Sequence, residues 1–204
     1  IFPLLLASLL MTRYVDNRPF VSLGFGFGLQ ALRQFFSGVL LGALMVSIFF
    51  TLAYGLGWLK LFPQGLSIAS TLKALLLYAL GFLGAALFEE LLLKGYLFQT
   101  LLEGVGVYPT IFLTSVAFSL LHLDNPHMTP LGLINLGLAG VLFAVAYLRT
   151  RALWLPISLH FAWNFFQYSY GLPISGITFP DALLRVELTA PDYLAGGAFG
   201  PEGS

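Results

Sequence analysis

The chain contains one long apolar run, LKALLLYALGFLGAALFEELLLKGYLFQTLL (residues 72–102), and this run decides the fold class. A membrane-spanning helix needs about 20 predominantly apolar residues, so the run is long enough to cross a bilayer. Backbone groups in lipid must be hydrogen-bonded within their own segment, which requires a helix. The run therefore predicts a transmembrane helix, although it carries Glu89, Glu90 and Lys94 deep inside it.

The composition of the whole chain agrees with this prediction. Of the 204 residues, 58% are hydrophobic and 9% are charged, and the mean hydropathy is +0.90. A soluble domain usually has about 25% charged residues, so a membrane protein is indicated. Nine basic residues balance nine acidic ones without a basic stripe, which gives no sign of a nucleic-acid partner. The sequence has no cysteine, which excludes disulfides and thiol catalysis.

Polar breaks divide the rest of the chain into further apolar segments. We expect spans over residues 35–59, 131–148 and 153–170, a shorter apolar segment over residues 110–123, and an irregular tail beyond residue 171. The predicted fold is all-α: a polytopic transmembrane helix bundle. The lipid bilayer is then the first partner of the chain.

The two adjacent glutamates need different partners. A carboxylate inside a membrane span costs roughly 2.5–3.5 kcal/mol on insertion scales. Glu90 and Lys94 are four residues apart, in the order that favours an ion pair on a helix. Glu89 is rotated by about 100° from Glu90 and cannot easily share that lysine. We therefore expect a structural role for Glu90 with Lys94, and another partner for Glu89.

Two other apolar segments supply candidates for that partner. FSLLH (residues 118–122) ends in His122, and HFAWN (residues 160–164) places His160 and Asn164 on one helix face. Each group alone could be structural, as a satisfied histidine or as a hydrogen-bonded pair between helices. Few other polar residues lie in the predicted spans, so we expect Glu89 and these three side chains to cluster.

Such a cluster is suited to amide hydrolysis. A glutamate and a histidine can hold and deprotonate a water molecule, with the glutamate as general base. A second histidine and an asparagine can donate hydrogen bonds to the developing oxyanion. Glu89, His122 and His160 would also make a three-ligand zinc site. Because Asn164 is a poor zinc ligand and a better oxyanion donor, we expect a mechanism without a cofactor, and zinc is the alternative.

Other chemistries are less well supported by the sequence. None of the three histidines is followed by Glu, no Gly-x-Ser-Gly is present, and no Asp lies inside a predicted span. A transporter could use Glu89 and the histidines as a proton relay. That reading requires a polar path on both sides of Glu89, and the sequence offers little of one. A non-catalytic scaffold with the same fold is the remaining alternative.

At these residues the sequence resembles the CPBP family, which comprises CAAX proteases and bacteriocin-processing enzymes and is also called the Abi family. It is similar to bacterial relatives of the Ras-converting CAAX endopeptidase. The family motif Glu-Glu-x-x-x-Arg matches residues 89–94, with Lys94 in place of arginine. Phe-x-x-x-His matches residues 118–122, and His-x-x-x-Asn/Asp matches residues 160–164. The glycine-rich residues 196–203 are similar to the segment that follows the last motif in many bacterial members.

The resemblance implies an intramembrane endopeptidase in a bacterial cytoplasmic membrane, built as an all-α transmembrane bundle with a polar intramembrane cavity. Its substrate would be a membrane-anchored or prenylated (CAAX-type) protein or peptide, cut near its C-terminus. Glu89 and His122 would activate water, and His160 and Asn164 would form the oxyanion hole. The supporting residues would be Glu90, Lys94 and Phe118. Lysine keeps the charge of the family's arginine but lacks its bidentate fork. Some relatives are linked to bacteriocin self-immunity, which is the alternative function.

The resemblance also suggests how the chain is organised. We expect a single membrane domain, in which residues 1–70 are N-terminal helices and loops and residues 71–204 form the CPBP-like catalytic core. The chain begins with Ile1 and stops abruptly after Ser204, so we expect a fragment at both ends.

Overall fold

The computed structural model of the protein describes residues 2–204. The longer helices are α1 (Phe2–Leu10), α2 (Leu29–Gly55), α3 (Ile68–Lys94), α4 (Tyr96–Val105), α5 (Val107–Leu120), α6 (Pro130–Thr150) and α7 (Trp154–Ser169). Short helical turns occupy Met11–Val15, Phe20–Leu23, α8 (Asp192–Ala195), Gly197–Phe199 and Pro201–Gly203. The strands β1 (Leu59–Phe62) and β2 (Arg185–Leu188) pair in antiparallel orientation. The predicted all-α bundle is confirmed.

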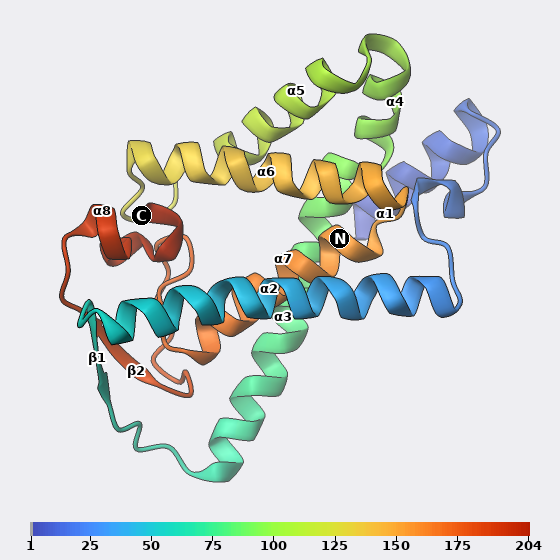
Figure 1. Cartoon of the computed structure of the whole chain (residues 1–204). Helices are drawn as coiled ribbons and strands as arrows, with labels where there is room; N and C mark the ends of the chain where they lie inside the picture. Colours follow the sequence, from blue (N-terminus) through green and yellow to red (C-terminus); the bar gives the residue numbers. More distant parts are fainter. Residues whose placement is uncertain (1) are drawn as a thin grey trace.

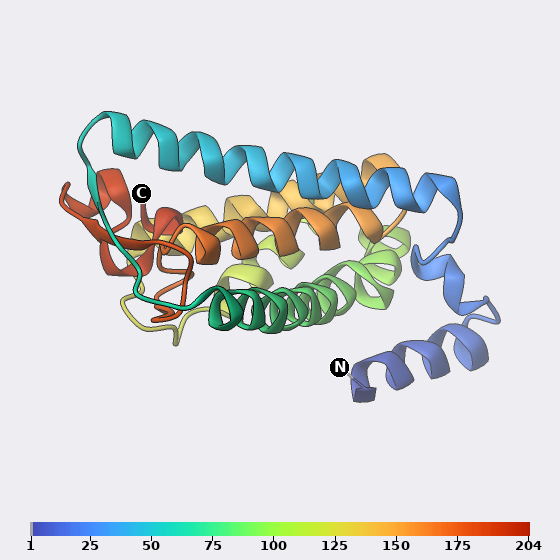
Figure 2. The same ribbon diagram turned by 90° about the horizontal axis from the view of Figure 1, so that it is seen from below.

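Helix α7 lies in the middle of the bundle, with α2 along one side and α6 along another, while α3 crosses behind them (Figures 1 and 2). The contact between α2 and α7 is close because two glycines of α2 face α7. A Cβ atom on Gly38 would overlap Ser158 and the Leu155 carbonyl, and one on Gly42 would meet the Leu159 carbonyl. Small residues one helical turn apart allow this approach between membrane helices.

The outer faces of the bundle are apolar. On α2, large hydrophobic side chains recur every four residues and are all exposed; they are Phe36, Leu40, Leu44, Ile48 and Leu52. Helix α2, residues 68–105 and α6 are each long and apolar enough to cross a membrane. An exposed apolar surface of this extent is suited to lipid rather than water. The protein is therefore an integral membrane protein.

Three predicted segments differ in the structure. The run over residues 72–102 is broken at Gly95 into α3 and α4. Helix α7, predicted as a span, has 16 residues and is not among the three long apolar ones. It is central and largely buried, so its neighbours face the lipid instead. The tail beyond Gly171 is not wholly irregular, because β2 pairs with β1. These strands have four residues each and are far apart in sequence, so no local pattern predicts their pairing.

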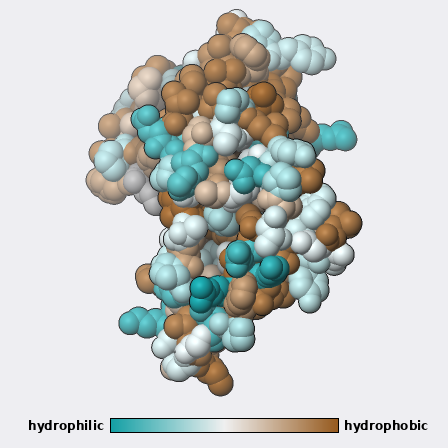
Figure 3. Space-filling view, turned by 90° about the vertical axis from the view of Figure 1, so that its left-hand side faces the viewer, coloured by the Kyte–Doolittle hydropathy of each residue, from teal (hydrophilic) through white to brown (hydrophobic). Residues whose placement is uncertain are grey.

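The two ends of the bundle differ in character. At one end, the turn between α6 and α7 packs against the segment before α2, where the Leu153 amide donates to the Gly24 carbonyl at 3.0 Å. The opposite end carries the sheet, α8 and the C-terminal residues (Figure 1). Figure 3 faces that end and shows hydrophilic side chains gathered across it among hydrophobic ones. This more polar end adjoins the candidate site.

Candidate active site

A cavity of about 380 Å³ lies among α3, α6, α7, the turn after α5 and the C-terminal tail. Most of its walls are apolar or aromatic. The polar residues that line it are Glu89, His122, Asn125, His160, Asn164, Ser175 and Glu202. The predicted polar cavity is therefore present, and it contains all four residues that the sequence predicts to be catalytic.

Glu89 projects into this cavity from the last turns of α3. Its Oε2 atom lies 3.7 Å from His122 Nε2 and 4.0 Å from His160 Nε2. These separations are too long for direct hydrogen bonds, and Oε2 has no hydrogen-bond partner within residues 2–204. The carboxylate oxygen and the two ring nitrogens therefore converge on a small region that another polar group can share.

His122 follows the end of α5 and is fixed by its own backbone. Its Nδ1 atom lies 2.8 Å from the Phe118 carbonyl oxygen. A carbonyl oxygen only accepts hydrogen bonds, so Nδ1 must carry the proton. In the neutral ring the other nitrogen, Nε2, then presents a lone pair to the cavity. The Phe118 ring, 4.9 Å from the imidazole, supports this orientation.

His160 lines the cavity and also forms a hydrogen bond with Glu90. Its Nδ1 atom lies 3.0 Å from Glu90 Oε1, and both side chains are buried. The Phe143 ring stacks on the imidazole at 4.9 Å and 13°. A carboxylate at this distance also stabilises the doubly protonated ring, in which both nitrogens donate.

The predicted ion pair between Glu90 and Lys94 is wrong. The structure places no such pair within 4 Å, and Lys94 Nζ and Glu90 Oε2 lack hydrogen-bond partners in the described chain. Glu90 points instead toward α7, where His160 offers a direct hydrogen bond. Lys94 Nζ lies 5.8 Å from the centre of the Phe118 ring, a cation–π distance. Lys94 thus packs against Phe118, one of the aromatic side chains that line the cavity.

Asn164 lies one helical turn after His160 and lines the same cavity. Its side chain forms no hydrogen bond with residues 2–204, so the amide is free to bind a group in the cavity. Asp124 and His127, in the turn before α6, are exposed and do not line the cavity.

Glu89, His122 and His160 are the residues that would hold zinc in the alternative mechanism. Within residues 2–204, no group of three or more His, Cys, Asp and Glu side chains has an arrangement that could hold a metal ion. These three side chains face one another, with the carboxylate oxygen 3.7 and 4.0 Å from the two nitrogens. Zinc therefore stays the alternative to a mechanism without a cofactor.

Sequence reasoning assigned no role to three polar residues of the cavity. Asn125 donates from Nδ2 to the Ser175 carbonyl at 3.0 Å, which ties the turn after α5 to the tail. Glu202 reaches the cavity from the end of the tail. Only the glycine-rich pattern around Glu202 was visible in the sequence, and no periodicity indicates that this segment folds back onto α7.

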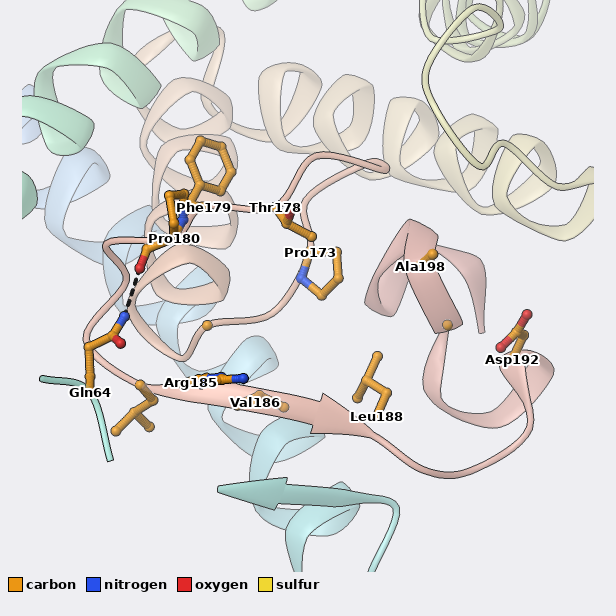
Figure 4. A pocket seen from close by; sticks show the side chains of 13 residues that line it. Gln64, Pro173, Thr178, Phe179, Pro180, Arg185, Val186, Leu188, Asp192 and Ala198 are labelled. Atoms are coloured by element: carbon orange, nitrogen blue, oxygen red, sulfur yellow. Dashed lines mark hydrogen bonds between the residues drawn. The ribbon is translucent and has the colours of Figure 1, made fainter. Parts of the chain in front are cut away.

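A larger cavity, of about 620 Å³, lies at the end of the molecule between the tail and the sheet. Figure 4 shows its lining, including Gln64, Arg185 and Asp192; Gln64 donates to the Pro180 carbonyl at 2.8 Å. None of the predicted catalytic residues lines it. Size alone therefore does not mark the active site, and the smaller cavity contains the groups that can perform chemistry.

The fold and the cavity define a polytopic helical membrane protein with a buried carboxylate–histidine site. Residues 71–166 match the model of the Rce1-like family, described as type II CAAX prenyl endopeptidase Rce1-like. The predicted resemblance to CAAX proteases is confirmed over these residues. The match includes all three motifs and supports a CAAX-type intramembrane protease. Neither a curated protein nor a solved structure matches the chain.

Proposed function

We propose that the protein hydrolyses a peptide bond near the C-terminus of a membrane-anchored or prenylated (CAAX-type) protein or peptide. The reaction takes place in a bacterial cytoplasmic membrane and uses a water molecule activated by Glu89 and His122. The observation that carries this proposal is the convergence of Glu89 Oε2 on the Nε2 atoms of His122 and His160, at 3.7 and 4.0 Å.

The hydrogen-bond state of His122 supports its role beside Glu89. Because Nδ1 donates to the Phe118 carbonyl, the neutral ring accepts at Nε2. A water molecule between Glu89 and His122 would donate one hydrogen to the carboxylate and one to Nε2. Its oxygen lone pairs then face the cavity and are oriented for attack on a carbonyl carbon.

The remaining two residues are suited to stabilising the oxyanion. Held by the Glu90 carboxylate, a protonated His160 donates from Nε2, and the free amide of Asn164 donates from Nδ2. The water oxygen bonds to the carbonyl carbon, and its proton passes to Glu89. The peptide C–N bond then breaks, and Glu89 returns the proton to the departing nitrogen. No covalent intermediate with the protein is required.

The position of the site supports this substrate class. The cavity is buried among helices whose outer faces meet lipid, so a soluble, folded protein could not present a peptide bond to Glu89. A segment held at the membrane by an anchor could enter through the polar end of the bundle. The match of residues 71–166 to a prenyl endopeptidase family supports the same class of substrate.

The test is cleavage of a library of membrane-anchored peptides by the purified protein in liposomes, with products identified by mass spectrometry. Three proteins are compared: the wild type, Glu89→Gln, and Glu103→Gln as the matched control. Glu103 is an exposed carboxylate on α4 that pairs with Arg18 at 2.6 Å and does not line the cavity. Each is assayed with and without a chelator.

We expect cleavage by the wild type and the control, little by Glu89→Gln, and no effect of the chelator. Loss of wild-type cleavage in the chelator would assign a metal to Glu89, His122 and His160. A folded wild type that cuts no member of the library would contradict the protease function and favour a scaffold.

A further inference from the structure

Glu202 is a buried carboxylate that the proposed reaction does not use. It belongs to the short turn Pro201–Gly203 and is 9% exposed. Its Oε1 atom accepts hydrogen bonds from Trp163 Nε1 at 3.0 Å and from Gln167 Nε2 at 2.8 Å. Both donors lie on α7, the helix that carries His160 and Asn164. The C-terminal tail is thus fastened to the central helix of the site.

The backbone of the C-terminal tail places the Glu202 side chain against α7. Gly200 has φ +99°, in the region that favours glycine, and a Cβ atom there would overlap the Pro173 carbonyl. Asn135 of α6 donates to the Glu202 carbonyl oxygen at 3.0 Å, which fixes the backbone at the same point. The Glu202 carboxylate is therefore held by α6 through its backbone and by α7 through its side chain.

The contacts of Glu202 and Glu90 lie on either side of Asn164. On α7 the residues His160, Trp163, Asn164 and Gln167 share one face, because they are spaced by three or four residues. Glu90 holds the first of them and Glu202 holds the second and fourth. Asn164, between them, forms no side-chain hydrogen bond with residues 2–204 that would fix its position. The orientation of the Asn164 side chain in the cavity therefore depends on the contacts that fix this face of α7.

We propose that Glu202 is a further positioning residue of the active site, which fixes the face of α7 that presents Asn164 and closes the cavity with the tail. This inference rests on the proposed protease function. Besides Glu202, Ser175 of the tail lines the cavity and accepts a hydrogen bond from Asn125. Release of Glu202 would therefore loosen one wall of the cavity as well as α7.

The role does not require Glu202 to be charged. Burial raises the pKa of its carboxyl above the ordinary 4.5, while hydrogen bonds from Gln167 and Trp163 act in the opposite direction. Either the carboxylate or a carboxyl C=O can accept both bonds from α7. A glutamine in its place can accept them through its amide oxygen. Positioning and direct proton transfer by Glu202 therefore predict different effects of Glu202→Gln.

The experiment compares Glu202→Ala and Glu202→Gln with the wild type in liposomes. Glu187→Ala is the matched control, because Glu187 is an exposed carboxylate of β2 in the same tail. Two readouts are taken: kcat and KM for a cleaved peptide, and the fluorescence of the Trp163 indole. The contribution of Trp163 is isolated by subtracting the spectrum of a Trp163→Phe protein, which retains Trp58 and Trp154.

We expect Glu202→Ala to lower kcat about tenfold or more, because small displacements of positioned groups cost this much. KM should change less than kcat, and the Trp163 emission should shift when its indole loses the carboxylate. Glu202→Gln should recover most of kcat and of the emission, and the control should match the wild type. If Glu202→Ala does not fold, Gln167→Met is tested in its place. This variant removes the hydrogen bond from Gln167 to Glu202 and should also lower kcat.

Three results would overturn the inference. The first is a Glu202→Gln protein as impaired as Glu202→Ala, since that would make the ionisable group itself essential. The second is an unchanged kcat in Glu202→Ala with a shifted indole emission. The third is an unshifted Trp163 emission in Glu202→Ala, which would show that Trp163 does not contact the Glu202 carboxylate. If the wild type cleaves and only this inference fails, the proposed function stands; if the wild type does not cleave, the proposed function fails first.

Discussion

Two neighbouring carboxylates at the end of α3 face opposite environments. Glu89 projects into the cavity, is 23% exposed, and has two histidine nitrogens near it but no direct hydrogen bond. Glu90 is fully buried and bonds His160 at 3.0 Å. The helix rotates adjacent residues by about 100°, which is sufficient to separate the two roles. One carboxylate is free to react, and the other is committed to holding a histidine.

This difference shows how a membrane protein accommodates two acidic residues in one span. A buried charge is tolerated when a partner and hydrogen bonds satisfy it. Glu90 has such a partner at Oε1, although its Oε2 has none, whereas Glu89 makes no direct hydrogen bond with residues 2–204. A carboxylate without a direct hydrogen bond is the expected state of a group that must exchange a proton. Substitutions on the two sides of α3 should therefore have different effects.

The largest expected effect is that of Glu89→Gln. Loss of the general base should lower kcat on the order of 10³-fold, within the range for acid–base catalysis. The melting temperature should stay the same or rise, because Glu89 Oε2 has no hydrogen-bond partner to lose. Cleavage kinetics and thermal unfolding in one detergent measure both quantities. A variant that loses activity and stability together would show that Glu89 is structural.

Asn164→Ala should have the next largest effect. Removal of one oxyanion donor typically lowers kcat about 10²–10³-fold. Stability should change little, since the Asn164 side chain bonds nothing within residues 2–204. The measurement is kcat against KM for one peptide, with thermal unfolding in parallel. A change confined to KM would place Asn164 in ground-state binding instead of the oxyanion hole.

Glu90→Gln should lower activity by about 10–100-fold, as is usual for residues that orient a catalytic group. The amide oxygen can still accept from His160 Nδ1 but cannot stabilise a protonated ring. In contrast to Glu89→Gln, this variant should also lose stability. An NMR spectrum of labelled histidine would report the change in the His160 ring. An unchanged His160 signal would refute the Glu90–His160 pair.

Lys94→Met should have a smaller effect, below about tenfold on kcat, because Lys94 makes no ion pair with Glu90 in the described chain. Methionine keeps the apolar contact with Phe118. If Lys94 were the partner of Glu90, as the sequence suggests, Lys94→Met would impair the protein as strongly as Glu90→Gln. Assaying the two variants side by side decides between these arrangements.

The smallest effect concerns pH and Glu202. Burial raises the pKa of this carboxyl, so the folded state favours its neutral form. Its contribution to stability is complete below the ordinary 4.5 and is lost as pH rises through the raised value. The melting temperature of Glu202→Gln minus that of the wild type should therefore increase from pH 4.5 upward. A constant difference over this range would contradict the raised pKa.

The sequence predicted which residues meet in the site better than it predicted their hydrogen-bond partners. Polar side chains in apolar runs are rare, so Glu89, His122, His160 and Asn164 could be expected to meet. The partner of Glu90 could not be predicted, because helical spacing reveals Lys94 on the same helix but not His160 on another. In the structure the contact between helices outweighs the local one.

The tail was the least predictable part of the chain. Its strand has four residues, and its pairing with β1 joins segments more than a hundred residues apart. Nothing in the local pattern of the glycine-rich tail shows that Glu202 returns to Trp163 and Gln167. Long-range contacts of this kind depend on how α6 and α7 are placed, which follows from the packing of the whole bundle.

The central claim, that an activated water attacks the peptide bond directly, is tested by mass spectrometry of products formed in a single turnover in H₂¹⁸O with hydroxylamine present. The account predicts one ¹⁸O atom in the new C-terminal carboxylate and no hydroxamate. A hydroxamate product would show that an acyl-enzyme forms first. The nucleophile would then be a side chain, and the roles given to Glu89 and His122 would be wrong.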